Sequence, residues 1–439
     1  MENKWINKTL LEISDKINYG YTASAKKTQE NNEPKFLRIT DIQGGNVDWS
    51  KVPYCEIDIK KLNKYKLNYG DIVVARTGNS TGENYLFNSD EKAVFASYLI
   101  RYKINKNIAE SKFIWYQMRT TKWKNFINNI KGGSAQAGAN AKTIGTFECI
   151  IPPLPIQKKI AHILSTLDDK IELNRKMNET LEAMAQAIFK SWFVDFDPVH
   201  AKARAKTKAD LETEAKKLGI TPEILELFPS EFEESELGMI PKGWEVKPFS
   251  DIAKLDTNSI KPFLYPDKVW KHFSIPAFDS SGYPTLEMGS DIKSNKYVVN
   301  KNAILSSKLN PHTPRTWIPN VIEGDLAICS TEFMQFIPHS NISRVYVYLL
   351  ITSKYFQDGI KSRVTGTTGS RQRAQPKQVA EIKICKPSDE LLDLFSKVVQ
   401  PIIDMQLENV EEIQTLQKTR DTLLPKLLSG ELDVSEVKI

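Results

Sequence analysis

The sequence predicts an α+β protein, with two mainly-β domains separated by two long antiparallel helices in an internal pseudo-two-fold repeat. An apolar seam with the 3.5-residue period of coiled coils runs through residues 153–194 and recurs near the C-terminus. A basic, strand-rich segment precedes each helix. Because motifs recur between these segments at a nearly constant offset, the chain is predicted to contain two copies of one unit.

The first seam lies within a predicted helix of about 40 residues, which would be roughly 60 Å long. It steps by four and three residues through Ile160, Leu164, Leu167, Ile171, Asn174, Asn178 and Leu181. A single seam of this kind also fits an ordinary amphipathic helix, so the recurrence is what favours a coiled coil.

The second seam consists of Phe395, Val399, Ile402, Gln406, Asn409, Ile413 and Leu416, each 235 positions after its counterpart. Pro401 and Pro425 lie in this copy, and we expect a kink or break near each. Antiparallel helices would place one domain at each end of the pair. Asn174 and Asn409 would then lie in the seam and help to fix its register.

Composition restricts the class of protein. The 439 residues, 41% hydrophobic and 26% charged, suit a soluble protein of two or three domains. No apolar run is long enough to span a membrane, and the first residues do not resemble a secretory signal. Four scattered cysteines without a C-x-x-C motif argue against disulfides or zinc, and we expect a reducing cytoplasm.

The net charge of +6 is distributed unevenly. Residues 1–150 and 241–386 each carry +8, whereas residues 151–240 carry −4 and residues 387–439 carry −6. A positive excess in one domain can arise by chance. The same excess in both predicted domains indicates that they attract a polyanion such as DNA.

The repeat sets the predicted domain boundaries. The segment KWINKTLLEI at 4–13 is echoed 239 positions later by GWEVKPFSDI. We expect domains and helices at 1–152 (first domain), 153–194 (long helix), 195–240 (connector), 241–386 (second domain), and 387–439 (long helix and tail). Shorter predicted elements include a strand over 93–102 and helices over 114–130 and 201–218.

Polar loops in the basic domains are the candidate DNA contacts. A Gly-Ser-x-Gln pattern at Gly133, Ser134 and Gln136 recurs at Gly369, Ser370 and Gln372. Arg and Gln side chains can read guanine and adenine edges, and glycine-rich backbone can approach phosphates. Any one loop could be a plain surface turn, but recurrence favours a role. The candidate contacts are Arg38, Arg76, Thr77, Asn79, Ser80, Gly133, Ser134, Gln136, Lys142, Lys308, Asn310, Arg315, Arg363, Thr367, Ser370, Arg371, Gln372 and Arg373.

With these motifs in place, the chain resembles the specificity subunit of type I restriction–modification systems. Six segments in order carry the resemblance: KFLRITD (35–41), YGDIVVARTG (69–78), IPPLPIQ (151–157), IPKGWEV (240–246), TGTTGSRQR (365–373) and RDTLLPKLLSGE (420–431). Ile156 departs from the family pattern, which usually has Glu there.

The resemblance implies two target-recognition domains that read the halves of a split DNA target, with the long helices fixing the spacer. It implies double-stranded DNA, two adenine-N6 methyltransferase subunits and ATP-driven restriction subunits as partners. No cofactor is expected on this chain, and S-adenosylmethionine, ATP and Mg²⁺ are expected on the partners. The sequence contains no Walker A motif and no Asn/Asp-Pro-Pro-aromatic methyltransferase motif.

Two alternatives of different class remain. One is an enzyme, a fused methyltransferase or endonuclease that incorporates methyl label or cleaves DNA by itself. The other is a coiled-coil scaffold without salt-sensitive DNA binding.

Overall fold

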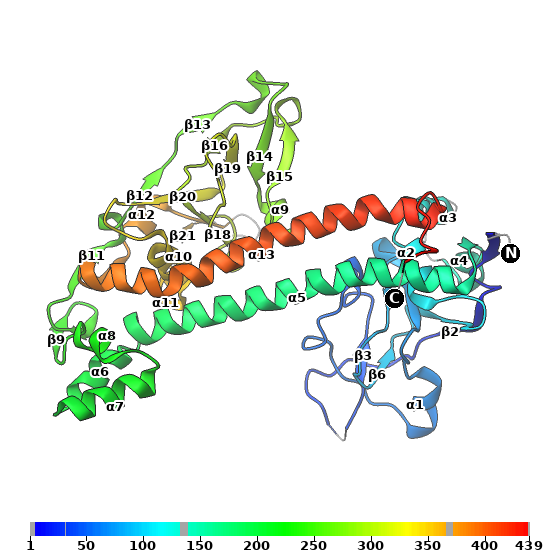
Figure 1. Cartoon of the computed structure of the whole chain (residues 1–439), viewed down its shortest axis with the longest axis horizontal. Helices are drawn as coiled ribbons and strands as arrows, with labels where there is room; N and C mark the ends of the chain where they lie inside the picture. Colours follow the sequence, from blue (N-terminus) through cyan, green and yellow to red (C-terminus); the bar gives the residue numbers. More distant parts are fainter. Residues whose placement is uncertain (1–4, 31, 132–138, 366–371, 438–439) are drawn as a thin grey trace. The chain divides into compact units, whose positions relative to one another are not determined.

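The computed structural model describes residues 5–30, 32–131, 139–365 and 372–437, and the chain forms two compact units (Figure 1). Unit 1 comprises residues 1–172 and 414–439, and unit 2 comprises residues 173–413. Two long helices, α5 (Leu154–Phe193) and α13 (Asp389–Ser429), each contribute residues to both units.

Unit 1 begins with strands and short helices. Its elements are β1 (Ile6–Thr9), β2 (Ser14–Tyr19), β3 (Lys35–Leu37), α1 (Ile59–Tyr65), β4 (Ile72–Ala75), β5 (Asn84–Leu86), β6 (Ala93–Phe95), β7 (Leu99–Ile104), α2 (Ser111–Gln117), α3 (Thr121–Lys131), α4 (Ala141–Gly145) and β8 (Glu148–Ile151). The order β2-β7-β4-β5 forms an antiparallel sheet, β1 pairs antiparallel with β8, and β3 pairs parallel with β6.

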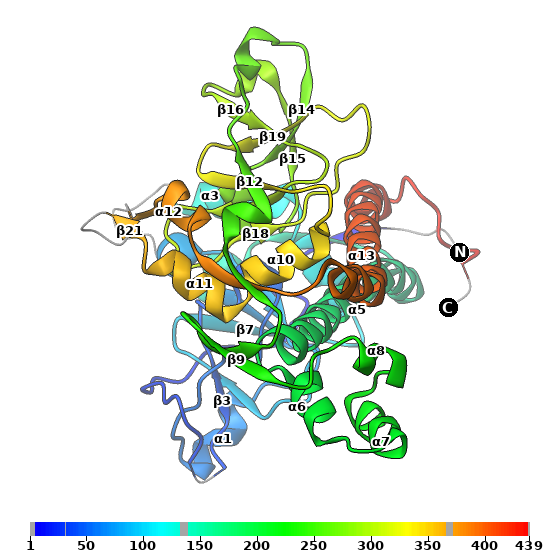
Figure 2. The ribbon, with the colours of Figure 1, turned by 90° about the vertical axis from the view of Figure 1, so that its left-hand side faces the viewer.

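After the second part of α5, unit 2 continues with three short helices, which are visible beneath α5 in Figure 2, and a hairpin. These are α6 (Asp197–Arg204), α7 (Lys208–Leu218), α8 (Pro222–Glu226), β9 (Phe232–Ser235) and β10 (Gly238–Pro241). The remaining elements are β11 (Glu245–Pro248), β12 (Ala253–Asp256), β13 (Ser259–Ile260), β14 (Val269–Phe273), α9 (Ile275–Ser280), β15 (Thr285–Met288), β16 (Lys296–Val298), β17 (Ile304–Ser307), β18 (Thr316–Trp317), β19 (Ala327–Ser330), β20 (Phe333–Pro338), α10 (Arg344–Thr352), α11 (Lys354–Lys361), β21 (Val364–Thr365), β22 (Arg373–Ala374), α12 (Pro376–Ala380) and β23 (Lys383–Lys386).

The two units repeat one topology, which confirms the predicted internal repeat. The antiparallel order β12-β20-β17-β18 matches β2-β7-β4-β5, and the pair β11–β23 matches β1–β8. The parallel pair β14–β19 matches β3–β6, although in unit 2 it belongs to a larger sheet, β13-β16-β19-β14-β15 (Figure 2).

The long helices run antiparallel in both units, as the repeat predicts. In unit 2 the ring of Phe189 packs on that of Phe395 with centroids 6.1 Å apart, and Asn178 contacts Asn409. In unit 1, Asp168 of α5 accepts a hydrogen bond from Arg420 of α13. Residue numbers therefore rise along one helix as they fall along the other. The seam positions Ile160, Leu164, Ile171, Leu181 and Ile413 are buried, and Leu167, Ile402 and Leu416 are half-buried.

The predicted break in the second helix is wrong, because α13 continues through both Pro401 and Pro425. Each proline removes one backbone N–H from the helix. Both residues lie on the exposed side, where water can satisfy the carbonyl groups left without a donor. The buried side, including Val399 and Leu427, packs without interruption.

Three predicted elements are each two in the structure. The strand over 93–102 is divided into β6 and β7 by a turn, in which Leu99 N donates to Ala96 O (2.9 Å). The helix over 114–130 is divided into α2 and α3 at residues 118–120. The helix over 201–218 is divided into α6 and α7 at Thr207, which caps α7 by accepting a hydrogen bond from Asp210 N.

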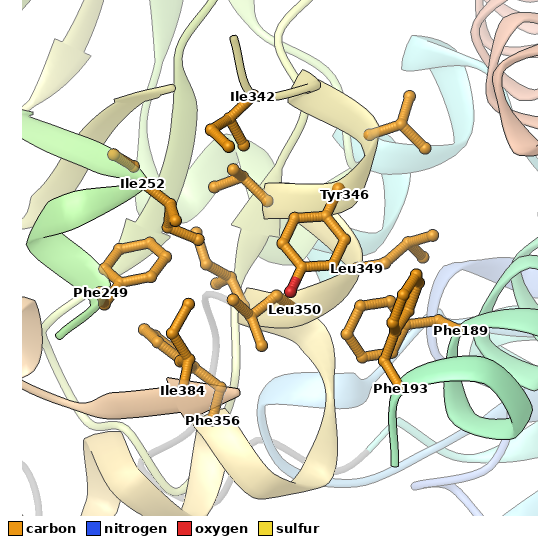
Figure 3. Packing of buried hydrophobic residues seen from close by; sticks show 14 of the residues in the cluster. Phe189, Phe193, Phe249, Ile252, Ile342, Tyr346, Leu349, Leu350, Phe356 and Ile384 are labelled. Atoms are coloured by element: carbon orange, nitrogen blue, oxygen red, sulfur yellow. The ribbon is translucent and has the colours of Figure 1, made fainter. Parts of the chain in front are cut away.

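Each unit has its own apolar core. In unit 2, α10 is enclosed by aromatic and aliphatic side chains from the strands and from both long helices, as Figure 3 shows around Tyr346, Phe193 and Phe249. In unit 1, the sheet packs on α2 and α3 and on the first half of α5. These cores fix the sheets whose connecting loops carry the candidate contacts.

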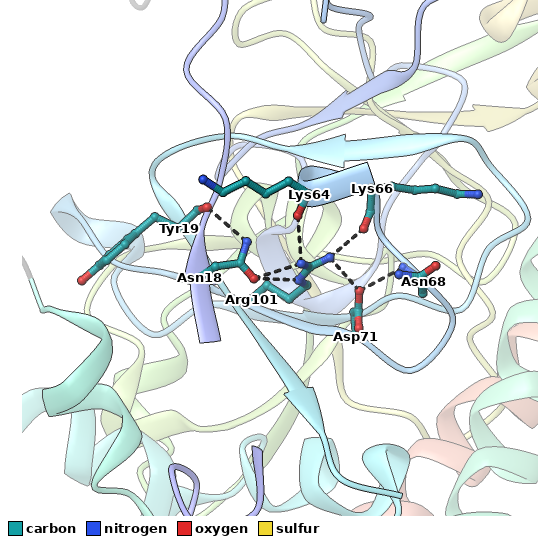
Figure 4. Close-up of polar contacts among 7 residues, drawn as sticks. All are labelled: Asn18, Tyr19, Lys64, Lys66, Asn68, Asp71 and Arg101. Atoms are coloured by element: carbon teal, nitrogen blue, oxygen red, sulfur yellow. Dashed lines mark hydrogen bonds and ion pairs between the residues drawn. The ribbon is translucent and has the colours of Figure 1, made fainter. Parts of the chain in front are cut away.

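A buried polar residue ties each four-stranded sheet to the neighbouring chain segment. In unit 1 the Arg101 guanidinium donates to Asp71 Oδ2 (3.2 Å), Asn18 Oδ1 and Lys66 O (2.6 Å), as Figure 4 shows. In unit 2 the matching strand position holds Gln335, which donates to Asp256 Oδ2 (3.2 Å) and Val298 O (3.0 Å). The repeat therefore preserves a polar junction even where the side chain differs.

Candidate nucleic-acid interface

The loop after β4 in unit 1 holds four of the predicted contacts. It turns at Gly78, whose φ of 66° is in the left-handed region that favours glycine. Ala139 N donates to Arg76 O (2.9 Å), which brings the segment that leads into α4 beside this loop. Asn140 caps α4 by accepting from Thr143 N (2.8 Å), and Lys142 is exposed on that helix. Arg76 to Ser80 and Lys142 therefore belong to one surface.

The loop after β17 in unit 2 is built in the same way. Ala374 N donates to Lys308 O (2.8 Å), and Asn310 N donates to Gln372 O (2.9 Å). Asn310 has φ 49°, at the place where the first copy has Gly78. The structure thus brings together Lys308, Asn310, Gln372 and Arg373, which are far apart in the sequence. Both units present the same pair of adjoining loops.

Three of the predicted arginines form ion pairs within the protein. Arg38 pairs with Asp41, Arg315 with Asp279, and Arg373 with Glu332. Hydrogen bonds to the carboxylates raise the pKa of Arg38 and the pKa of Arg373 above the ordinary value for arginine, so both remain charged. A DNA contact by any of these residues would share the arginine with a carboxylate.

Other predicted residues make a ring contact or a single hydrogen bond, or they lie outside the described residues. The Arg76 guanidinium lies 5.0 Å from the Tyr19 ring centroid, and Arg363 donates to Gly359 O (2.9 Å). Ser80 Oγ accepts from Gln43 Nε2 (3.1 Å). Thr77 is half-buried, whereas Asn79 is exposed. The predicted contacts outside the described residues are Gly133, Ser134, Gln136, Thr367, Ser370 and Arg371.

A basic cavity beside the first loop was not predicted. It has a volume of about 410 Å³ and is lined by Arg119, Lys124 and Lys131 together with Asn79 and Gly45. The Arg119 guanidinium stacks 4.6 Å from the Trp115 ring centroid, and burial lowers the pKa of Arg119. The only signal in the sequence was the pair of lysines on α3, Lys124 and Lys131. Arg119 is brought to the cavity by the tertiary structure.

The titratable groups within the described parts of the chain do not form a metal centre. There, no cluster of three His, Cys, Asp or Glu side chains could hold a metal ion. Burial raises the pKa of the Cys55, Cys149 and Cys329 thiols to about 12, which suppresses the thiolate that a nucleophile requires. Over the same residues, no helix is both long and apolar enough to cross a bilayer.

Comparisons with known proteins agree with this architecture. Residues 2–183 match the family model of the type I restriction modification DNA specificity domain. The HindI specificity subunit of Haemophilus influenzae is 29% identical over 455 aligned positions, which cover 90% of this chain and 95% of that one. The MjaIX specificity subunit of Methanocaldococcus jannaschii is 27% identical, covering 76% of this chain and 72% of that one.

A solved structure shares the fold. The type I restriction–modification S subunit from M. genitalium superimposes with a TM-score of 0.55 at 15% identity, covering 97% of this chain and 96% of that one. At this identity, the likeness to the solved structure concerns the fold. Residues 2–183 thus match the type I restriction modification DNA specificity domain, and the chain is similar over most of its length to type I restriction–modification specificity subunits.

Proposed function

We propose that this chain reads a split DNA target, with one half-site contacted by each basic repeat. The family is that of the DNA-recognition subunit, which is not catalytic and functions with DNA and other subunits. The observation that carries the proposal is the recurrence of one loop pair: Ala139 on Arg76 in unit 1 and Ala374 on Lys308 in unit 2.

The proposed division of labour follows the sequence boundaries. Residues 1–152 and 241–386 act as target-recognition domains, residues 153–194 and 387–439 act as the spacer, and residues 195–240 connect the copies. Support comes from charge, since both proposed recognition domains are basic, whereas the connector 195–240 and the C-terminal segment 387–439 are acidic and residues 153–194 are nearly neutral. DNA is attracted to the basic domains and repelled by the acidic segments.

The proposed DNA contacts are the predicted residues of the two loop pairs, with Arg371 and Arg373 in the second domain and Gln136 and Lys142 in the first. Arginine can donate two hydrogen bonds to guanine, and glutamine can pair with adenine. We add Arg119, Lys124 and Lys131 as backbone contacts, because they line one cavity beside Asn79. Such contacts strengthen binding without setting the sequence.

The proposed partners are two adenine-N6 methyltransferase subunits and ATP-driven restriction subunits, assembled in the cytoplasm. S-adenosylmethionine, ATP and Mg²⁺ would bind to those partners, and the family implies no cofactor on this chain.

The function is tested with the purified full-length chain and duplex DNA. We expect binding that weakens steeply with added salt, selection of a bipartite motif from a random duplex library, and no methyl transfer from labelled S-adenosylmethionine. Absence of any selected motif, or methyl incorporation by the chain alone, would contradict the proposal.

The reading role of the second loop is tested by the double substitution Arg371→Ala/Arg373→Ala. If either arginine reads a guanine, the change should cost roughly 1–3 kcal/mol at the specific site and relax one base of the motif. Lys377→Ala, which removes a nearby charge from α12, is the control for charge alone. Unchanged affinity and selectivity in the double variant would exclude the loop as a reader.

A further inference from the structure

Carboxylates hold three candidate DNA-contacting arginines in one geometry. Arg38 donates Nε to Asp41 Oδ2 (3.0 Å) and Nη2 to Asp41 Oδ1 (2.7 Å). Arg373 donates Nε to Glu332 Oε2 and Nη2 to Glu332 Oε1, both at 3.0 Å. Arg315 makes the same pair of bonds to Asp279 at 2.6 and 2.9 Å. In each case the carboxylate occupies the side edge of the guanidinium, formed by Nε and Nη2.

The side-edge pairing leaves the end edge, formed by Nη1 and Nη2, with donors to spare. A guanidinium has five N–H groups, and the carboxylate takes only two of them. Guanine has two neighbouring acceptors, O6 and N7, which can bind two parallel N–H donors of one guanidinium. Among the hydrogen bonds of the described residues, those of the Arg38 and Arg373 guanidinium groups are donated by Nε and Nη2 and none by Nη1.

The side chains of Arg38 and Arg373 are more exposed than that of Arg315. The side chain of Arg38 is 38% exposed and that of Arg373 is 45% exposed. The side chain of Arg315 is only 11% exposed, and its Nη1 is already donated to Thr313 O (3.1 Å). Arg315 therefore acts within the fold, whereas Arg38 and Arg373 can reach a ligand with the end edge.

The two carboxylate residues are held in different ways. Asp41 accepts a third bond, from Arg38 N (2.8 Å), and its side chain is 10% exposed. Glu332 lies in the turn between β19 and β20, where its N–H donates to Ser330 Oγ (3.2 Å) and its carbonyl accepts from Lys308 N (2.9 Å). The Asp41 carboxylate is therefore fixed directly, whereas Glu332 is fixed through its main chain.

We propose that Asp41 and Glu332 are positioning residues, which orient Arg38 and Arg373 so that each presents its end edge to a guanine, one in each recognition domain. The inference rests on the proposed DNA-reading function. The carboxylate charge also repels phosphate, so it disfavours the sequence-independent contacts that a free arginine would make. Specificity would thus come from a fixed geometry and from repulsion together.

The test uses the full-length chain and a random duplex library, with Glu332→Gln, Asp41→Asn, Arg373→Ala and Arg38→Ala compared with wild type. We expect Glu332→Gln and Arg373→Ala to relax the same guanine in one half-site, by about 5- to 100-fold in discrimination. Asp41→Asn and Arg38→Ala should relax one guanine in the other half-site. Glu323→Gln and Asp90→Asn remove exposed carboxylates from the same domains and should change neither half-site.

The outcomes separate the two levels of the proposal. A wild-type chain that selects no motif contradicts the proposed function and the inference with it. A wild-type motif that Arg373→Ala and Arg38→Ala leave intact overturns the inference alone. If the arginine variants relax a base but the carboxylate variants do not, or raise affinity for all duplexes equally, the carboxylates are not positioning residues. Arg373→Lys, which keeps the charge but loses the fork, should behave like Glu332→Gln even if the latter folds poorly.

Discussion

Asn409 on α13 donates a hydrogen bond from Nδ2 to Oδ1 of Asn178 on α5, at 2.8 Å. Asn178 in turn donates to Gln406 O (3.1 Å), and Asn174 donates to Glu412 Oε2 (2.7 Å). The apolar seam is therefore interrupted by a polar layer whose hydrogen bonds form only in one axial alignment, although Asn174 Oδ1 is buried without a partner. Such a layer fixes the register of paired helices at some expense in stability.

Replacing Asn409 by alanine should destabilise the protein by about 1–2 kcal/mol, because Oδ1 of Asn178 then loses its donor in a largely buried seam. Urea unfolding of the full-length chain measures the change. Thr180→Ala, on the exposed side of α5, is the matched control. Asn178→Leu/Asn409→Leu should recover the lost stability, since an apolar pair leaves nothing unsatisfied. An Asn409→Ala variant as stable as wild type would contradict the role of the layer.

If the long helices set the spacer, lengthening both should lengthen the target. Four residues inserted after Asn178 add about 6 Å to α5. The compensating insertion belongs after Gln406, since Gln406 and Asn409 are the residues that face Asn178. With both insertions, we expect the selected spacer to grow by about two base pairs at ~3.4 Å each, while both half-sites keep their sequences.

Selection from a random duplex library reads out the spacer, and the single insertion in α5 is the control. The single insertion breaks the alignment of the seam and should lower the free energy of unfolding. A doubly lengthened chain that binds DNA with the original spacer would show that the helices do not act as the ruler.

Asp168 of α5 links this helix to α2 and to α13 in unit 1. It accepts from Tyr116 Oη (2.6 Å) and from Arg420 Nη1 (2.7 Å). Asp168→Ala should destabilise the chain by about 2–4 kcal/mol, because a buried hydroxyl and a half-buried cation both lose their acceptor. Asp169→Ala, one residue away on the exposed side, should change stability by less than about 0.5 kcal/mol. Equal effects of the two substitutions in urea unfolding would refute the stabilising role of the Asp168 hydrogen bonds.

His272 should make unit 2 less stable in mild acid. Burial lowers the pKa of His272, assisted by Lys296, whereas Glu287, whose Oε2 lies 3.1 Å from Nδ1, acts in the opposite direction. Since the pKa is lower in the folded chain, the unfolded chain binds the proton more readily below about pH 6.5. Stability is therefore present above that pH and is lost as the pH falls toward the folded-state pKa.

The measurement is the urea midpoint at pH 7.5 and pH 5.5. We expect the drop to be smaller in His272→Gln than in wild type, and to persist in His162→Gln, which changes an exposed histidine of α5. An identical drop in wild type and His272→Gln would assign the acid sensitivity to other groups.

The candidate site shows which features could be predicted from residue patterns and which could not. The basic loops could be predicted because Gly78, Asn310 and the polar residues around them are local features of the sequence. The partner of Arg373 could not, because Glu332 is distant in sequence and becomes adjacent only when Lys308 N pairs with Glu332 O beside β22. Arg119 was missed for the same reason, since its stacking on Trp115 and the cavity beside Gly45 depend on packing.

The sequence by itself determined the two long helices, the internal repeat and the basic character of the two copies, because periodicity and charge are written along the chain. Only the tertiary structure decided that α13 passes through Pro401 and Pro425, that Asn409 pairs with Asn178, and that carboxylates hold the candidate reading arginines. The physical reason is that these outcomes depend on which remote groups meet. A proline on an exposed face is tolerated, and an arginine takes whichever carboxylate the fold brings within reach.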